Sequence, residues 1–352
     1  MENDTLGRRY SAAPPAVTFY IQFLAEEWPL ENARPPVFRI LSVDGGGYLG
    51  IATAAFIRGI EQHFGMRFSE RFDLFCGTST GAILAHGLAY GRTGEELTNL
   101  YQLLGKSVFG KQRWTRGYLF KARYDNKPLR KVLHDEFKEA VLGDLLANQK
   151  HALVTAFNLT EGKPRIFKTD HATHLTLHNK FLIADVALAS SAAPYYFPAV
   201  PVKNPVNGVT ELYCDGGVVA NHPALLGFSE AVSDLKKPPA EVRILSISTP
   251  GADFGEGVGT LRGGDRGLAR WKAKLASMFI ESGAAIADQI LRRLIAALPP
   301  EMQPRYERIE MRNRGGYGMD CATSDATRAL IHEGVTQASQ NPIRDQVSRI
   351  IA

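Results

Sequence analysis

A serine between two glycines is the residue in this sequence whose type and spacing point most directly to chemistry. Ser79 stands in Gly77-Thr-Ser-Thr-Gly81, after the apolar run 72–76 and before the alanine-rich segment 82–89, which we expect to be helical. A sharp strand-to-helix turn of this kind has room only for glycine beside the serine, and it exposes the hydroxyl at the end of the sheet. The positive end of the new helix would lie beneath that hydroxyl. The pattern fits a nucleophile elbow or an ordinary tight turn, so its neighbours must decide.

A second loop, Asp44-Gly-Gly-Gly47, follows the apolar run 37–43 and precedes a segment with helical spacing of apolar residues. Three glycines can form a tight turn or a nucleotide loop, but the spacing matches neither the dinucleotide fingerprint nor a P-loop. The backbone N–H groups of Gly45, Gly46 and Gly47 could instead approach a developing oxyanion, because no side chain intervenes. Since a similar loop serves the serine of lipases and esterases, we favour an oxyanion hole.

A base must take the proton of the serine hydroxyl, and the sequence offers two arrangements. Asp215 begins Asp215-Gly-Gly217 after a predicted strand at 211–214, although this pattern can also be a simple turn. A Ser-Asp-His triad is the alternative, because His222 follows Asp215 closely, but no histidine lies in a motif typical of such a triad. A carboxylate within hydrogen-bond reach can serve as the base, so we prefer Asp215.

The elements that must position these residues alternate between strands and helices. Strands are expected at 37–43, 72–76, 151–157, 165–168, 211–214, 242–248 and 306–311, and helices at 52–64, 82–89, 95–104, 129–137, 181–191, 223–235, 268–298 and 323–338, the last closing the chain. The pattern indicates one α/β domain over 37–352 with a mostly parallel sheet. Residues 251–352 are the helical and glycine-rich part of this domain, and an arm at 1–36 precedes it. Because the carboxyl ends of parallel strands share one edge of a sheet, the Asp44-Gly-Gly-Gly loop, Ser79 and the Asp215-Gly-Gly loop should meet in one crevice.

The composition, with 45% hydrophobic and 22% charged residues, is that of a globular protein with enough material for a core. No apolar run reaches the roughly 18 residues of a membrane-spanning helix, and no signal peptide is recognisable, so we expect a cytoplasmic protein. The three cysteines lie far apart, which fits a reducing compartment and excludes a zinc cluster. His171, His174 and His178 have metal-like spacing but few further ligands nearby, and we interpret them as a surface or structural cluster.

A net charge of +5 suits an anionic membrane surface or a phosphate-bearing ligand, although basic faces without a partner are common. The basic and aromatic stretch 106–124 could be a lid, a surface that touches lipid headgroups, or a loop with neither role. A glycine-rich region at 251–267 and the helix start after it contain Arg262, Arg266 and Arg270. These arginines could hold phosphates or form a solvated surface.

Four blocks in fixed order make the sequence similar to the patatin-like phospholipases. The blocks are Asp44-Gly-Gly-Gly-Tyr-Leu-Gly50, Gly77-Thr-Ser-Thr-Gly81, Ala189-Ser-Ser-Ala-Ala-Pro194 and Asp215-Gly-Gly217. The resemblance implies a three-layer α/β/α fold, a catalytic dyad of Ser79 and Asp215, and no metal, cofactor or histidine in the mechanism. It also implies oxyanion donors and motif residues that support the site, namely Gly45, Gly46 and Gly47 as donors and Asp44, Gly77, Gly81, Gly216 and Gly217 as support.

The partners that the resemblance implies are membrane phospholipids as substrates, through a peripheral contact with the inner face of the membrane, and no nucleic acid polymer. Some bacterial proteins that resemble this family are membrane-degrading effectors switched on by a cyclic di- or trinucleotide in antiviral defence. Arg262, Arg266 and Arg270 are the candidate contacts for such an activator. The sequence leaves open a homo-oligomer, the acyl position and the headgroup preference.

One position departs from the pattern of the family. Its glycine loop usually has arginine where this chain has Leu49, so a cation beside the oxyanion site, or a fixed partner for a nearby carboxylate, is missing. The sequence does not reveal which basic residue replaces it. A general lipid esterase without nucleotide control, or a binding protein with an inert dyad, therefore stays open as an alternative.

Overall fold

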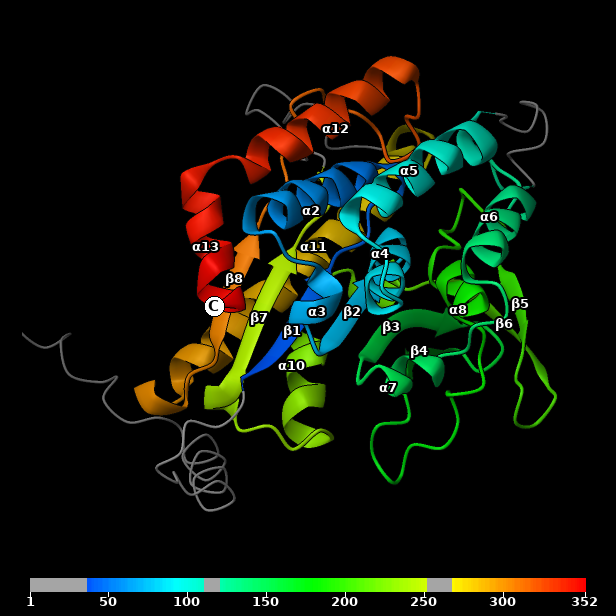
Figure 1. The fold of residues 1–352 in the computed structure, drawn as a ribbon. Coiled ribbons are helices and arrows are strands. Elements are labelled where there is room, and N and C mark those ends of the chain that lie inside the picture. Colours follow the sequence, from blue (N-terminus) through cyan, green and yellow to red (C-terminus); the bar gives the residue numbers. More distant parts are fainter. Residues whose placement is uncertain (1–36, 111–120, 252–267) are drawn as a thin grey trace, which may run out of the picture.

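Among the described residues of this computed structural model, which are 37–110, 121–251 and 268–352, eight strands form one sheet (Figure 1). The predicted arm at 1–36 lies outside these residues, as do the side chains of 268–277 and 279. The strands are β1 (Phe38–Val43), β2 (Leu74–Thr78), β3 (His151–Asn158), β4 (Lys163–Lys168), β5 (Val200–Lys203), β6 (Thr210–Asp215), β7 (Val242–Ile247) and β8 (Arg305–Ile309). Their order is β5-β6-β3-β2-β1-β7-β8, and β4 also pairs with β3.

The centre of the sheet is parallel, whereas one end is antiparallel. Strands β3, β2, β1, β7 and β8 pair in parallel, and β1, β2 and β7 are apolar runs buried on both faces, as parallel strands usually are. Strands β4 and β6 pair antiparallel with β3, and β5 pairs antiparallel with β6. The predicted mostly parallel sheet is thus confirmed, and the two strands expected at 151–157 and 165–168 form the hairpin of β3 and β4. Strand β5, which the sequence did not predict, forms a second hairpin with β6.

The pairing of β3 brings the ends of two distant strands together. Strand β4 runs along one edge of β3 over residues 153–158, so β2 and β6 must both use the other edge, because a strand has only two. On that edge β2 ends with Thr78 beside Thr155, and β6, running the opposite way, ends with Asp215 beside Ala156. The carboxyl ends of β2 and β6 therefore meet head to head. Asp215 therefore does not end a parallel strand, as the sequence led us to expect, because β6 runs antiparallel to β3.

Helices cover both faces of the sheet and complete the predicted three-layer arrangement (Figure 1). On one face lie α2 (Gly50–Phe64), α3 (Phe68–Arg71), α4 (Thr80–Ala89), α5 (Gly94–Leu104), α6 (Lys127–Phe137), α7 (Asp144–Ala147), α8 (Ile183–Ser190), α12 (Ser324–Ala338) and α13 (Asn341–Ile351). On the other lie α10 (Ala224–Ser233) and α11 (Leu268–Ala297). Single turns are η1 (Gly47–Leu49), η2 (Gly105–Phe109), α9 (Gly217–Ala220), η3 (Pro239–Glu241) and η5 (Pro300–Met302). Alternate residues of β1 divide between the two cores, with Leu41 in one and Ile40 in the other.

The predicted end of the chain was wrong, because α13 follows α12. Pro342 lies in the first turn of α13, where the missing N–H of proline costs nothing. The helix delivers the chain end to the sheet, where Arg39 Nη2 donates to the Ala352 carbonyl oxygen at 2.7 Å. No helix in the described ranges has both the length and the apolar character needed to cross a membrane.

Two helix-interior glycines give opposite predictions for the same substitution. A Cβ at Gly334 of α12 would lie 2.2 Å from the carbonyl oxygen of Ala52 in α2, whereas no described atom lies within 4 Å of one at Gly283 of α11. We expect Gly334→Ala to lower the free energy of unfolding by about 1–3 kcal/mol through overpacking. Gly283→Ala should raise it by up to about 1 kcal/mol through helix propensity. Urea unfolding of both variants measures this, and equal effects would contradict the close packing of α12 on α2.

Candidate active site

Ser79 occupies a strained turn between β2 and α4. Its backbone angles are φ 54° and ψ −122°. Such a conformation costs a non-glycine residue on the order of 1–3 kcal/mol and is typical of functional sites. The helix that follows can pack against β1 only through glycine, because a Cβ at Gly81 would lie 2.1 Å from the Val43 carbonyl oxygen. Gly77, the other glycine of the motif, is part of β2 and pairs with Val43.

The structure brings Ser79 and Asp215 into direct contact. Ser79 Oγ donates a hydrogen bond to Asp215 Oδ2 at 2.7 Å, and the Gly217 N–H donates to Asp215 Oδ1 at 2.6 Å. Each carboxylate oxygen therefore has one donor, which fixes the plane of the carboxylate. No third side chain is needed to orient this pair.

The end of α8 supports both partners, a role that sequence reasoning did not assign. Ser190 Oγ accepts the backbone N–H of Ser79 at 2.8 Å. Its carbonyl oxygen accepts the Gly216 N–H at 3.1 Å, and the Ala192 carbonyl accepts the Asp215 N–H at 3.0 Å. The signal for this role was the block Ala189-Ser-Ser-Ala-Ala-Pro194, whose serines and small residues let three backbone segments approach closely.

Burial changes the acidity of the Asp215 carboxyl group. The Asp215 residue is 2% exposed, and this burial raises the pKa of its carboxyl group to about 6, although the hydrogen bonds from Ser79 and Gly217 oppose the rise. An aspartate with this pKa is mostly ionised at pH 7, yet it holds a proton more strongly than an exposed aspartate does. These are the properties of an effective general base at neutral pH.

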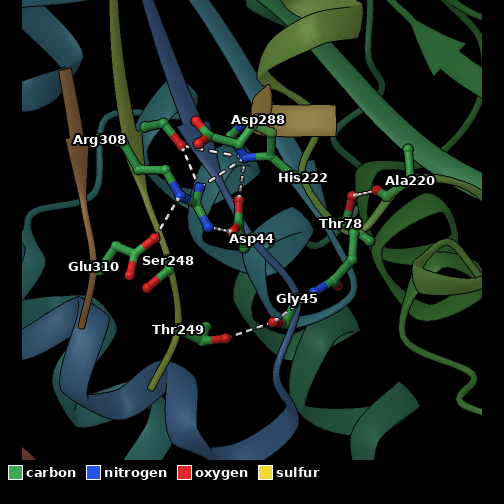
Figure 2. Close-up of polar contacts among 12 residues, drawn as sticks. Asp44, Gly45, Thr78, Ala220, His222, Ser248, Thr249, Asp288, Arg308 and Glu310 are labelled. Atoms are coloured by element: carbon green, nitrogen blue, oxygen red, sulfur yellow. Dashed lines mark hydrogen bonds and ion pairs between the residues drawn. The ribbon is translucent and has the colours of Figure 1, made fainter. Parts of the chain in front are cut away.

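The three glycines of the loop after β1 do not face the same way. The Gly45 N–H points to the Asn221 carbonyl oxygen at 3.4 Å, and the Gly45 carbonyl accepts a hydrogen bond from Thr249 Oγ1 (Figure 2). Gly46 and Gly47 line the same cavity as Ser79, and no acceptor for their N–H groups is found within the described part of the chain. Of the three predicted oxyanion donors, two are therefore available and Gly45 is engaged elsewhere.

An apolar cavity of about 670 Å³ opens onto the Ser79–Asp215 pair. Its size falls within the range of small-molecule sites. Aliphatic and aromatic side chains from α4, α5, η2, α6 and the segment after α8 form most of its wall, among them Ile83, Leu104, Val108, Phe109, Leu129 and Phe197. Such a wall accommodates a hydrocarbon chain and disfavours a charged ligand.

His222 lies in a different polar cluster from the Ser79–Asp215 pair. Its Nδ1 atom lies 2.8 Å from Arg308 Nη1 and 3.1 Å from Asp44 Oδ1, and its Nε2 atom lies 3.2 Å from the Tyr306 hydroxyl (Figure 2 shows the Asp44 and Arg308 contacts). Both ring nitrogens are thus occupied by groups other than Ser79 and Asp215. This arrangement argues against the triad that the sequence left open.

Leu49, where an arginine was expected from the resemblance, is 2% exposed and packs in the hydrophobic core. The carboxylate of the glycine loop nevertheless has a guanidinium partner. Arg308 Nη2 of β8 donates to Asp44 Oδ2 at 2.8 Å (Figure 2). Sequence reasoning missed Arg308, whose only signal was an arginine within a predicted strand.

The predicted structural role of the histidine cluster is favoured by its contacts. His171, Glu230 and Asp234 place ligand atoms within 4.8 Å of one another, as a metal site would require. However, Lys168 Nζ donates to Glu230 Oε1 at 2.7 Å and to Asp234 Oδ2 at 2.8 Å. The lysine ammonium already supplies the positive charge between these carboxylates.

The candidate nucleotide contacts are not described. Arg262, Arg266 and the side chain of Arg270 lie outside the described residues. So do residues 111–120 of the basic and aromatic stretch.

Comparison with known proteins assigns the chain to a family. A family model described as patatin-like phospholipase matches residues 41–227, which include the glycine loop, Ser79 and Asp215. A "cGAMP-activated phospholipase" of Pseudomonas aeruginosa is 36% identical over 74% of this chain and 76% of its own length. One of Vibrio cholerae is 33% identical over 66% of this chain and 70% of its own length.

Among solved structures, human GIVD cytosolic phospholipase A2 is similar with a TM-score of 0.48 and 12% identity, over 96% of this chain and 64% of that chain. The family assignment rests on the sequence matches, which extend over most of the sheet and the whole serine site. The chain belongs to the patatin-like phospholipase family.

Proposed function

We propose that this chain releases fatty acids from membrane phospholipids, with Ser79 as the nucleophile and Asp215 as the general base. The observation that supports this most directly is the 2.7 Å hydrogen bond from Ser79 Oγ to Asp215 Oδ2 beside an apolar cavity. The family and the names of the relatives support a phospholipid rather than a general ester as the substrate.

In the first half of the reaction Ser79 Oγ attacks the ester carbonyl carbon while its proton passes to Asp215 Oδ2. The carbonyl oxygen becomes an oxyanion, which the Gly46 and Gly47 N–H groups and the positive end of α4 stabilise. The intermediate then expels the lysolipid alkoxide, which takes the proton from Asp215. Ser79 is left as an acyl ester.

In the second half a water molecule attacks the acyl ester and gives its proton to Asp215. The second tetrahedral intermediate collapses, the fatty acid leaves, and Ser79 Oγ recovers its proton from Asp215. One carboxylate therefore serves as base and acid in turn. Its pKa of about 6 lies close enough to neutrality for both tasks.

The entrance of the cavity suits contact with a lipid surface. Pro194 and Val218 line the cavity and are exposed, and Tyr195 beside them is 43% exposed. The hydrogen bonds from Asp215 to Ala192 and from Gly216 to Ser190 tie the two segments of this rim together. Exposed apolar residues next to a substrate cavity mark an interaction surface, and here we assign it to the membrane.

Control by a cyclic nucleotide is the second part of the proposal. It is favoured by the relatives named "cGAMP-activated phospholipase", which are 33–36% identical to this chain. Arg262, Arg266 and Arg270 remain the proposed phosphate contacts. In this proposal the enzyme acts from the cytoplasm at the inner face of the membrane, as an effector in antiviral defence.

Fatty acid release from phospholipid vesicles tests the activity. We expect wild type to release fatty acid in the presence of cGAMP and more slowly without it, and Ser79→Ala to be at least about 1,000-fold slower, as for other serine hydrolases without their nucleophile. A panel of cyclic di- and trinucleotides identifies the activator. Equal release by wild type and Ser79→Ala would refute the proposed nucleophile, and no response to any nucleotide would refute the control.

The pH dependence follows from Asp215. Because the base must be ionised and burial raises its pKa to about 6, kcat/KM should be constant above pH 7 and fall about tenfold per pH unit below pH 6. An ordinary aspartate, with a pKa of about 3.9, would keep full activity down to about pH 5. A neutral, water-soluble ester is the substrate, with circular dichroism as the control for folding. Full activity at pH 4.5 would contradict the assignment.

The rim can be tested apart from the chemistry. Tyr195→Asp places a charge on the proposed membrane surface, so hydrolysis of vesicles should fall about tenfold or more while hydrolysis of a soluble short-chain ester changes little. Val209, 51% exposed in the β5–β6 hairpin at the far end of β6 from Asp215, provides the matched control Val209→Asp. Similar losses on vesicles for both variants would exclude a specific rim.

A further inference from the structure

We propose that Arg308 is the positioning residue of the oxyanion loop, a role that no motif in the sequence assigns to it. The inference rests on the proposed function, because it concerns the same site. It starts from a buried ion pair that the mechanism itself does not use.

Arg308 reaches the loop across the neighbouring strand. Ser42 of β1 pairs with Ser246 of β7, which pairs with Arg308 of β8, so these residues stand in one row across the sheet. Because serine is small, the guanidinium can extend over it, and Arg308 Nη1 donates to Ser246 Oγ at 2.9 Å. Arg308 Nη2 then donates to Asp44 Oδ2 at 2.8 Å (Figure 2).

Both charges of this pair are out of water. The side chains of Arg308 and Asp44 are 8% and 4% exposed. Burial opposes the charged guanidinium, but the Asp44 carboxylate outweighs it and holds the pKa of Arg308 above its usual value. A pair this strongly coupled keeps one geometry, since either charge alone would be buried without compensation.

A series of polar contacts links the pair to α11. His222 Nδ1 lies 2.8 Å from Arg308 Nη1 and 3.1 Å from Asp44 Oδ1, so the imidazole ring packs against both members of the pair. On the other side of the ring His222 Nε2 lies 3.2 Å from the Tyr306 hydroxyl, and that hydroxyl donates to Asp288 Oδ1 of α11. His222 and Tyr306 therefore connect the buried ion pair to α11.

The pair controls the loop because Asp44 directly precedes Gly45. Without Arg308 the buried Asp44 carboxylate would lose its cationic partner and keep His222 beside Oδ1. Its Oδ2 atom would compete for nearby donors, among them the N–H groups of the loop itself. The Gly46 and Gly47 N–H groups, which the mechanism needs for the oxyanion, would then be displaced. Arg308 thus leaves those amides free for the reaction.

The test compares Arg308→Met and Arg308→Lys with wild type on a soluble ester. Loss of one oxyanion donor lowers kcat by about 100- to 1,000-fold in other hydrolases. We expect Arg308→Met to lower kcat about 100-fold and to change KM by no more than about threefold. Arg308→Lys keeps the positive charge but lacks the forked guanidinium, so its kcat should be about tenfold higher than that of Arg308→Met. Arg165→Met is the matched control, because Arg165 of β4 forms its ion pairs with Glu161 and Glu211. This substitution should leave kcat unchanged.

A second measurement reports the loop directly. A fluorophosphonate bound to Ser79 places its phosphoryl oxygen in the oxyanion site, so its ³¹P resonance should shift between wild type and Arg308→Lys but not in Arg165→Met. A purely structural ion pair would lower the melting temperature and leave both kcat and this resonance unchanged. If Arg308→Met fails to fold, Arg308→Lys alone decides: wild-type kcat with an unshifted resonance overturns the inference.

The outcomes separate this inference from the function on which it rests. Equal ester hydrolysis by wild type and Ser79→Ala overturns the proposed function and the role of Arg308 with it. An active wild type, an inactive Ser79→Ala and a fully active, folded Arg308→Met overturn the role of Arg308 alone.

Discussion

The head-to-head meeting of β2 and β6 on one edge of β3 is the constraint on which the rest of the site depends. Thr78 and Asp215 pair with adjacent residues of β3, so the serine that follows Thr78 must face the aspartate that ends β6. The contact is fixed by backbone pairing and needs no long side chain to bridge a gap. A dyad of two short side chains, a serine and an aspartate, can therefore be held at hydrogen-bond distance without a histidine between them.

Two features of this site raise the free energy of the folded protein, and the contacts around them must offset that cost. Ser79 has a strained backbone, and Asp215 is desolvated. The compensation is local, because the end of α8 accepts hydrogen bonds from the backbone of both segments and the Gly217 N–H donates to the carboxylate. Strain and desolvation at one place, held by dense hydrogen bonding around it, are typical of a site under functional constraint.

Two separate polar clusters lie beside the glycine loop. The Ser79–Asp215 pair opens onto the apolar cavity, whereas the cluster of Asp44, His222 and Arg308 is buried between β1, β7, β8 and α11 (Figure 2). The loop lies between them, with Gly45 anchored toward Asn221 and Thr249 and with Gly46 and Gly47 facing the cavity. Anchoring one side of the loop leaves the amides of the other side free, which is the requirement of an oxyanion site.

The sequence by itself determined the glycine loop, the serine elbow, most helices and strands, and the mostly parallel sheet, because each follows from local periodicity and from turns that only glycine permits. It did not determine that β6 is antiparallel, that α13 follows α12, that the Gly45 amide is engaged, or that Arg308 lies against Asp44. These features depend on pairing between residues far apart in the chain, and in the case of Arg308 and Asp44 the separation is 264 positions. Local patterns record which conformation a segment prefers, whereas the partner of a buried charge or of a strand edge is decided only when the whole sheet has formed.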